Sequence, residues 1–186
     1  MEPRSEPLWN RFRNQNSDGT NGTNGSRRDW TYRGASSAQD CGDDILRMLL
    51  AIDPGADQGW AVFHSTTRQL VACGLGDPPE AGVSRVCLER PHPFKTKAPV
   101  RSIITLALRA GETAGPYRRL GLQIDYFEPA QWKKGSIKKD IHHARIWASL
   151  TPAEQEVISR AVVKVAKGKH HNVMDAVGIG MFAVGR

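Results

Sequence analysis

The feature that most constrains the fold is an unbroken apolar run from Met48 to Ile52, which ends at an acidic residue, Asp53. A short run with no polar position favours a strand that is buried on both faces, because a strand with one wet face alternates apolar and polar side chains. Pro54 and Gly55 then supply a turn. The run therefore predicts the central strand of a sheet, with a carboxylate at its end.

The segments after this run indicate strands first and helices later. Further strands are predicted at Trp60 to Phe63, Leu70 to Cys73, Val86 to Leu88 and Leu122 to Phe127. The polar connection HSTTRQ between the first two of these favours an antiparallel meander, and strand and helix patterns alternate afterwards. We expect an α/β fold with a mixed sheet of about five strands, three antiparallel and then parallel, flanked by helices.

Helix signals occupy the rest of the chain. One helix is expected from Val100, a short one from Pro129 to Gly135, and another after Ser136, which can cap it. Thr151 and Glu154 form a capping box for the next. The expected apolar faces are Ile103, Ala107, Ala110 and Ala114 in the first helix, and Ile137, Ile141, Ala144 and Ala148 in the helix after Ser136.

The last helix is expected to begin at Asn172, whose side chain can cap it. Its apolar positions are Val173, Val177 and Met181, and this start places Asp175 in the first turn.

Residues 1–44 differ in composition from residues 45–186. The stretch NRFRNQNSDGTNGTNGSRRD is rich in Asn, Gly, Ser and Arg and has no apolar period, so it cannot bury enough surface to offset the entropy of ordering. We expect a disordered tail and one folded domain, 45–186. Cys41, Cys73 and Cys87 show neither zinc-site nor disulfide spacing, so we expect reduced thiols without a functional role.

The net charge of +7 favours a polyanionic partner such as nucleic acid. A membrane protein is not expected, because no apolar run approaches the roughly 18 residues of a spanning helix, and no signal segment opens the chain. We expect a cytoplasmic protein. Glu2 and Glu6 disfavour a mitochondrial transit segment.

Three acids stand where chemistry can occur. Asp53 and Glu89 each end an apolar strand, so their carboxylates lie side by side if the strands are neighbours, and Asp175 lies in the last helix. Clustered carboxylates repel one another unless cations neutralise them, and hard oxygen ligands suit Mg²⁺ or Mn²⁺. Such a cluster can hold two ions for phosphodiester hydrolysis.

Each acid also has a structural interpretation, which stays open at this point. An Asp before Pro-Gly is commonly a turn residue. Glu89 can form an ion pair with its neighbour Arg90, and Asn172 with Asp175 can be a helix cap and a dipole-facing acid.

Four motifs follow one another along the chain: LLAIDPGADQGWAVF, VCLERP, YFEPAQWKKGSIKKDIHHARIW and HNVMDAVGIG. Together they resemble the motifs of RuvC-type Holliday-junction resolvases, which have a ribonuclease-H-like fold. The resemblance runs from Met48 to the C-terminus and implies metal-dependent cleavage of four-way DNA junctions by a homodimer, in the cytoplasm of a bacterial or phage-infected cell.

By this resemblance Asp53, Glu89 and Asp175 are metal ligands, and Lys133 and Lys139 match the basic positions. The family has an acid or His three residues before the last Asp, whereas this chain has Asn172. Either Asn172 coordinates through its amide oxygen, or the adjacent His171 substitutes for it, or the protein binds junctions with little cleavage.

Basic residues around the acids are candidates for DNA contact. PHPFKTKAPVR follows Glu89 and places Phe94 among cationic groups, which suits gripping phosphates while stacking an unpaired base. The DNA-binding candidates are Phe94, Lys95, Lys97, Lys133, Lys134, Lys138, Lys139, Lys167 and Lys169. Lysines on a helix are also what a solvated face contains.

Three rival functions remain. A ribonuclease H or another nuclease of the same fold shares the acids, and a junction-binding module keeps the basic residues without needing metal. Actin-like and sugar-kinase ATPases also open with a strand, an Asp and a Gly turn, but they need a second phosphate-binding domain.

Overall fold

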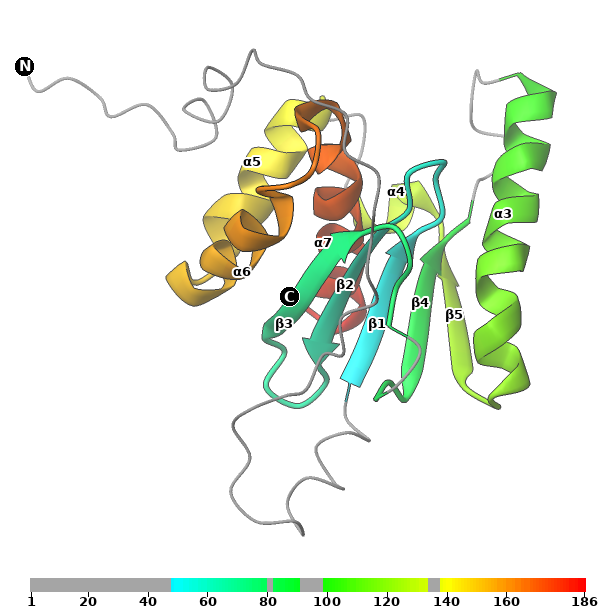
Figure 1. Ribbon diagram of the computed structural model, residues 1–186, viewed down its shortest axis with the longest axis horizontal. Helices are drawn as coiled ribbons and strands as arrows, with labels where there is room; N and C mark the ends of the chain where they lie inside the picture. The colour runs from blue at the N-terminus through cyan, green and yellow to red at the C-terminus, as the bar shows by residue number, and fades with distance from the viewer. Residues whose placement is uncertain (1–47, 80–81, 91–98, 134–137) are drawn as a thin grey trace, which may run out of the picture.

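In the computed structural model, the described residues form a five-stranded sheet with helices on both faces (Figure 1). The structure describes residues 48–79, 82–90, 99–133 and 138–186. The strands are β1 (Met48–Asp53), β2 (Gly59–His64), β3 (Leu70–Leu75), β4 (Arg85–Glu89) and β5 (Gln123–Phe127). The helices are α3 (Val100–Arg119), α4 (Pro129–Trp132), α5 (Lys139–Ser149), α6 (Pro152–Val162), the 3-10 helix η1 (Lys167–Lys169) and α7 (His170–Ala183).

Several predictions concern residues outside this range. They are the disordered tail 1–44, the cap Ser136 with Ile137, and the DNA-binding candidates Phe94, Lys95, Lys97 and Lys134. The short helix that was predicted from Pro129 to Gly135 ends earlier, at Trp132, with Lys133 as its C-cap.

The strand order is β3-β2-β1-β4-β5. β2 pairs antiparallel with both β1 and β3, while β4 is parallel to β1 and β5 is parallel to β4. The predicted mixed sheet is therefore confirmed. Because β1 and β4 run parallel with Ile52 opposite Leu88, the residues that follow, Asp53 and Glu89, emerge at the same edge of the sheet.

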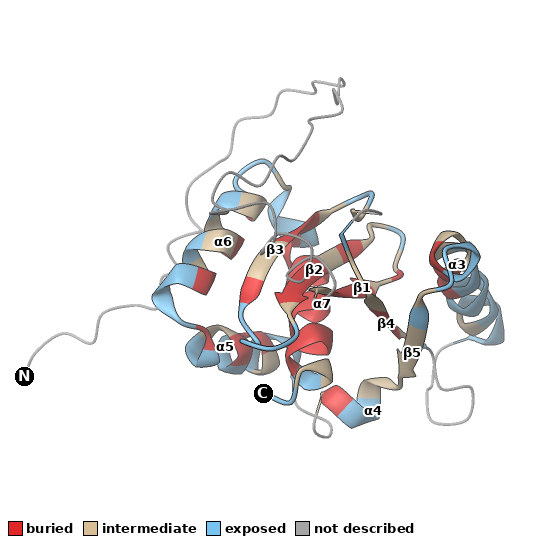
Figure 2. Cartoon of the chain, turned by 90° about the horizontal axis from the view of Figure 1, so that it is seen from below, coloured by how far each residue is buried: buried red, intermediate tan, exposed pale blue. Residues whose placement is uncertain are grey.

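β1 is central and buried on both faces, which explains its unbroken apolar sequence. Leu50 and Ile52 face the cluster that contains Ala114 and Tyr117 of α3. Leu49 and Ala51 face the other side, in a cluster with Ile179 of α7. Figure 2 shows the buried strands between α3 on one side and α5, α6 and α7 on the other.

α7 packs unusually close to the sheet. A Cβ atom added at Gly180 would lie 2.2 Å from Cε2 of Phe63 on β2, so only glycine permits this approach. The predicted apolar positions Val173, Val177 and Met181 are buried, as expected. The helix that carries Asp175 is thus held firmly against β1 and β2.

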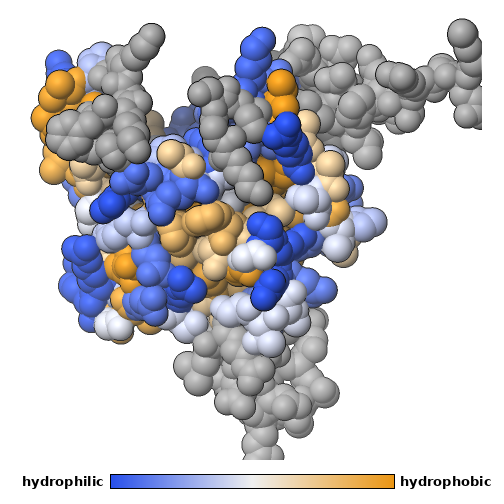
Figure 3. Space-filling model, turned by 180° about the vertical axis from the view of Figure 1, so that it is seen from behind, coloured by the Kyte–Doolittle hydropathy of each residue, from blue (hydrophilic) through white to orange (hydrophobic). Residues whose placement is uncertain are grey.

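α3 begins at Val100, as predicted, but only its second half covers the sheet. Ala110 and Ala114 are buried, whereas the predicted core residue Ala107 is exposed. The first half extends beyond the ends of the strands, and Val100 and Leu108 are 70% and 63% exposed. Figure 3, which views the molecule from behind, shows hydrophobic side chains on the side where α3 lies.

The predicted apolar face of the helix after Ser136 is wrong. α5 begins at Lys139, and Ile141, Ala144 and Ala148 are exposed. Its buried residues are His143 and Ile146. The side of α5 that faces α7 is set both by apolar packing and by the contact of His143 with Asp175.

The capping box of α6 is confirmed. The side chain of Thr151 accepts a hydrogen bond from the Glu154 amide, and the Glu154 carboxylate accepts one from the Thr151 amide.

The two described cysteines, Cys73 and Cys87, are free and buried, and burial raises the pKa of each thiol to about 12. No described helix is both long and apolar enough to cross a membrane.

Candidate metal and DNA site

Three carboxylates from separate elements share one environment at the sheet edge. Asp53 ends β1, Glu89 ends the neighbouring parallel strand β4, and Asp175 projects from α7 with only 4% of its surface exposed. Burial raises the pKa of Asp53 to about 7, and the charges of Glu89 and then Asp175 add to the rise. The negative charges of neighbouring acids thus contribute to the raised pKa values of Asp53 and Glu89, whereas the pKa of Asp175 is lowered.

Two lysine ammonium groups lie against these carboxylates. Nζ of Lys133 is 3.4 Å from Oε2 of Glu89 and 3.7 Å from Oδ2 of Asp175, and Nζ of Lys139 is 3.5 Å from the same Oδ2. Because Lys133 reaches both acids, Glu89 and Asp175 face a common point. Lys133 also lies over the Trp132 ring, 4.4 Å from its centroid.

The alternative ion pair between Glu89 and Arg90 does not form. Arg90 pairs instead with Glu128, at 3.3 Å. Glu89 is turned toward the site, where burial chiefly raises its pKa; Lys133 opposes the rise and Asp175 adds to it.

His143 of α5 is a member of the site that the sequence analysis missed. Its Nε2 lies 2.7 Å from Oδ1 of Asp175, and the residue is only 4% exposed. Burial alone would raise the pKa of Asp175, but the His143 hydrogen bond, followed by the Lys133 charge, outweighs it and lowers the pKa. The signal was available: Lys139 and His143 are four residues apart, so they share one face of a helix.

The start of the last helix corrects two predictions. α7 begins at His170, so Asn172 is not its cap and Asp175 lies in the second turn. Asn172 is buried, and its amide donates a hydrogen bond of 2.7 Å to the carbonyl of Asp57 in the β1–β2 turn. The side chain is thus used to fasten α7 to the turn that follows Asp53.

His171 lies near the same charges and is half-buried. Burial, followed by the Lys139 charge, lowers its pKa, while the charge of Asp175 opposes this.

The carboxylate oxygens of the three acids are of the type that binds a hard divalent cation such as Mg²⁺. Oε2 of Glu89 is buried and lacks a well-aligned hydrogen bond, and burial, followed by the charges of Glu89 and Asp175, raises the pKa of Asp53. A monovalent cation, the Lys133 ammonium, already lies between two of the acids. Within the described ranges, no three His, Cys, Asp or Glu side chains are close enough together to hold an ion as they stand.

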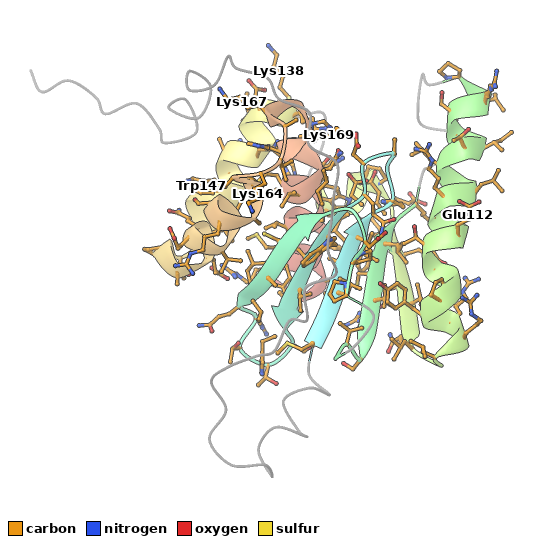
Figure 4. The ribbon with its side chains drawn as sticks, viewed as in Figure 1. Glu112, Lys138, Trp147, Lys164, Lys167 and Lys169 are labelled. Atoms are coloured by element: carbon orange, nitrogen blue, oxygen red, sulfur yellow. The ribbon has the colours of Figure 1, made fainter. Side chains whose placement is uncertain are left out.

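Further lysines surround this end of the sheet. Lys138, Lys167 and Lys169 lie at the end where β1 terminates, and Lys164 lies lower on the same side (Figure 4). Lys169 is partly neutralised, because its Nζ is 2.6 Å from Oδ1 of Asp57. The lysines predicted from the sequence and described by the structure thus gather on the carboxylate side.

The arrangement of strands and acids decides the fold. A meander of three antiparallel strands is continued by two parallel ones, and acids end the first and fourth strands and project from the helix packed across β1. The chain has a ribonuclease-H-like fold.

Solved structures to which the ribonuclease-H-like chain is similar include two resolvases bound to DNA. One is Thermus thermophilus RuvC in complex with a Holliday-junction substrate, with 13% identity, a TM-score of 0.46, and coverage of 72% of this chain and 90% of that one. The other is the Fowlpox virus resolvase with Holliday-junction DNA, with 15% identity, a TM-score of 0.49, and coverage of 74% and 98%. No protein-family model and no curated protein matches the sequence.

Proposed function

We propose that the protein is a metal-dependent endonuclease that cleaves four-way junctions or other branched DNA. The observation that carries the proposal is the group of acids Asp53, Glu89 and Asp175, of which the first two are half-buried and the third is buried, bordered by lysines. The order of the four resolvase-like sequence motifs supports branched DNA as the substrate class.

Asp53, Glu89 and Asp175 would hold Mg²⁺ or Mn²⁺, with His171 or Asn172 as a further ligand. When bound, two such ions activate a water and stabilise the leaving oxygen of a phosphodiester. The hydrogen bond from Asn172 to the Asp57 carbonyl favours a positioning role for this amide.

The lysines have two tasks in this proposal. Lys133 pairs with Glu89 and Asp175, and Lys139 pairs with Asp175, so these lysines offset the negative charge of the acids. With the substrate present, the same ammonium groups are placed to attract the phosphate at the acids, while Lys138 and Lys167 contact the flanking backbone. The near-twofold symmetry of a four-way junction favours a homodimer with two sites.

The test compares cleavage of a four-way junction with that of linear duplex of the same sequence, in Mg²⁺. Asp53→Asn should abolish cleavage but leave junction binding in Ca²⁺ intact, because it removes a metal ligand and no basic group. Its effect should be non-additive with that of Glu89→Gln, since both residues hold one cluster. Wild-type cleavage by Asp53→Asn would refute the proposal.

The other outcomes assign a different function. Equal affinity for junction and duplex would indicate a nuclease with less structural selectivity, and a preference for RNA-DNA hybrid would indicate a ribonuclease H. Junction binding without cleavage in any divalent metal would indicate a binding module. The ion pairs between Lys133 and two of the acids favour that second candidate.

A further inference from the structure

The two oxygens of the Asp175 carboxylate have different partners. Oδ1 is 2.7 Å from Nε2 of His143, whereas Oδ2 faces the ammonium groups of Lys133 and Lys139. An ionised carboxylate only accepts hydrogen bonds, so His143 donates from Nε2 and carries its proton there. One oxygen is therefore engaged by the protein, and the other is directed to the point where cations gather.

His143 is held in place by its surroundings. It is 4% exposed on the buried side of α5, one turn before the core residue Ile146. A buried N–H without a hydrogen-bond partner is unfavourable, so the ring does not readily turn away from Asp175. The contact also joins α5, which carries Lys139, to α7, which carries Asp175.

We propose that His143 is a positioning residue that fixes Asp175 as a ligand with a single available oxygen. By engaging Oδ1, it directs Oδ2 toward the cation site and prevents the carboxylate from rotating. Partners of this kind commonly change metal affinity by about 10- to 100-fold. The inference rests on the proposed metal site. It gives His143 a role in which its side chain contacts Asp175 and neither the metal nor the DNA.

The test uses the full chain and three variants. His143→Leu removes the donor, His143→Gln retains an amide N–H at a similar reach, and Ile146→Ala weakens the same side of α5 without touching a carboxylate. Mn²⁺ affinity is measured without DNA by electron paramagnetic resonance, below the Tm of every variant. Junction affinity in EDTA and cleavage in Mg²⁺ are measured in parallel.

His143→Leu should weaken Mn²⁺ binding by about 10- to 100-fold, and His143→Gln should restore most of it. Ile146→Ala should lower the Tm yet bind Mn²⁺ as the wild type does, which separates positioning from stability. Junction affinity in EDTA should be the same in all. If His143→Leu does not fold, His143→Asn, which is too short to reach Oδ1, replaces it.

Wild-type Mn²⁺ affinity in His143→Leu, or an affinity in His143→Gln no better than in His143→Leu, would overturn the positioning role. If the wild type binds Mn²⁺ in a His143-dependent way but cleaves no DNA, only the nuclease proposal fails. If the wild type binds no Mn²⁺, both proposals fail.

Discussion

Replacing Gly59 by Ala should damage both stability and cleavage, because this glycine is where α7 meets the β1–β2 hairpin. Gly59 pairs with Asp53 in the sheet, and a Cβ atom added there would lie 2.0 Å from the carbonyl oxygen of Asn172. The atom that it meets belongs to the backbone, so no rotamer change relieves the clash.

The size of the effect follows from this distance. A carbon and a carbonyl oxygen normally approach to about 3.3 Å, so the first turn of α7 must move by about 1.3 Å. Overpacking of this kind costs about 1–3 kcal/mol, which corresponds to a Tm lower by roughly 2–12 °C. Asp175 lies one turn further along α7, and a misplacement of about 1 Å can reduce a catalytic rate about 100-fold.

The assay is thermal unfolding followed by junction cleavage in Mg²⁺ at a temperature at which all variants are folded. Gly168→Ala is the matched control, because it lies just before α7 and a Cβ there meets nothing within 4 Å. It should keep wild-type Tm and cleavage. If Gly59→Ala also matches the wild type in both measurements, α7 does not need this close approach and the reasoning is refuted.

Two further predictions concern charge. The double variant Lys133→Ala, Lys139→Ala should bind junctions more weakly and flatten the slope of log K against log salt by about 2, near 0.9 for each lost phosphate contact; an unchanged slope would contradict the DNA role. Burial alone would raise the pKa of Glu154, but hydrogen bonds from Arg186, the Leu70 amide and Thr151 outweigh it and bring the pKa to about 2. Because the pKa is lowered on folding, the ionised carboxylate stabilises the folded state. This stabilisation is complete above the ordinary pKa of 4.5 and is lost as the pH falls toward 2. It amounts to at most about 3 kcal/mol, and to less because solvent partly reaches Arg186. Glu154→Gln should therefore reduce the free energy of unfolding at pH 7 by about 1–3 kcal/mol and weaken its pH dependence below 4.5; an unchanged acid denaturation curve would show that the carboxylate is not needed.

The sheet was predictable because its strands carry local signals. The apolar run from Met48 marked β1, and the turn residues after Asp53 marked the hairpin, so the acids at the strand ends followed directly. The capping box at Thr151 is equally local, and it appears where it was expected.

The errors arise where tertiary contacts override a local pattern. Asn172 has the residue type of a helix cap, but its side-chain amide donates a hydrogen bond to the carbonyl of Asp57, which is far away in sequence. The helix begins two residues before Asn172. In α5 the periodicity of Ile141, Ala144 and Ala148 suggested a core face, whereas the buried side is the one on which His143 meets Asp175. Neither partner is visible from the local sequence.

The docking of α7 across β1 and β2 has a consequence for the order in which function can appear during synthesis. Among the described elements, the first acid lies in the earliest strand and the third in the final helix, so they meet only after every intervening element has been made. A nascent chain that ends before residue 170 would possess all five strands of the sheet and several lysines but would lack Asp175. If the site is catalytic, the enzyme is therefore inactive until its chain has been translated through α7, and no partly made product can cut DNA.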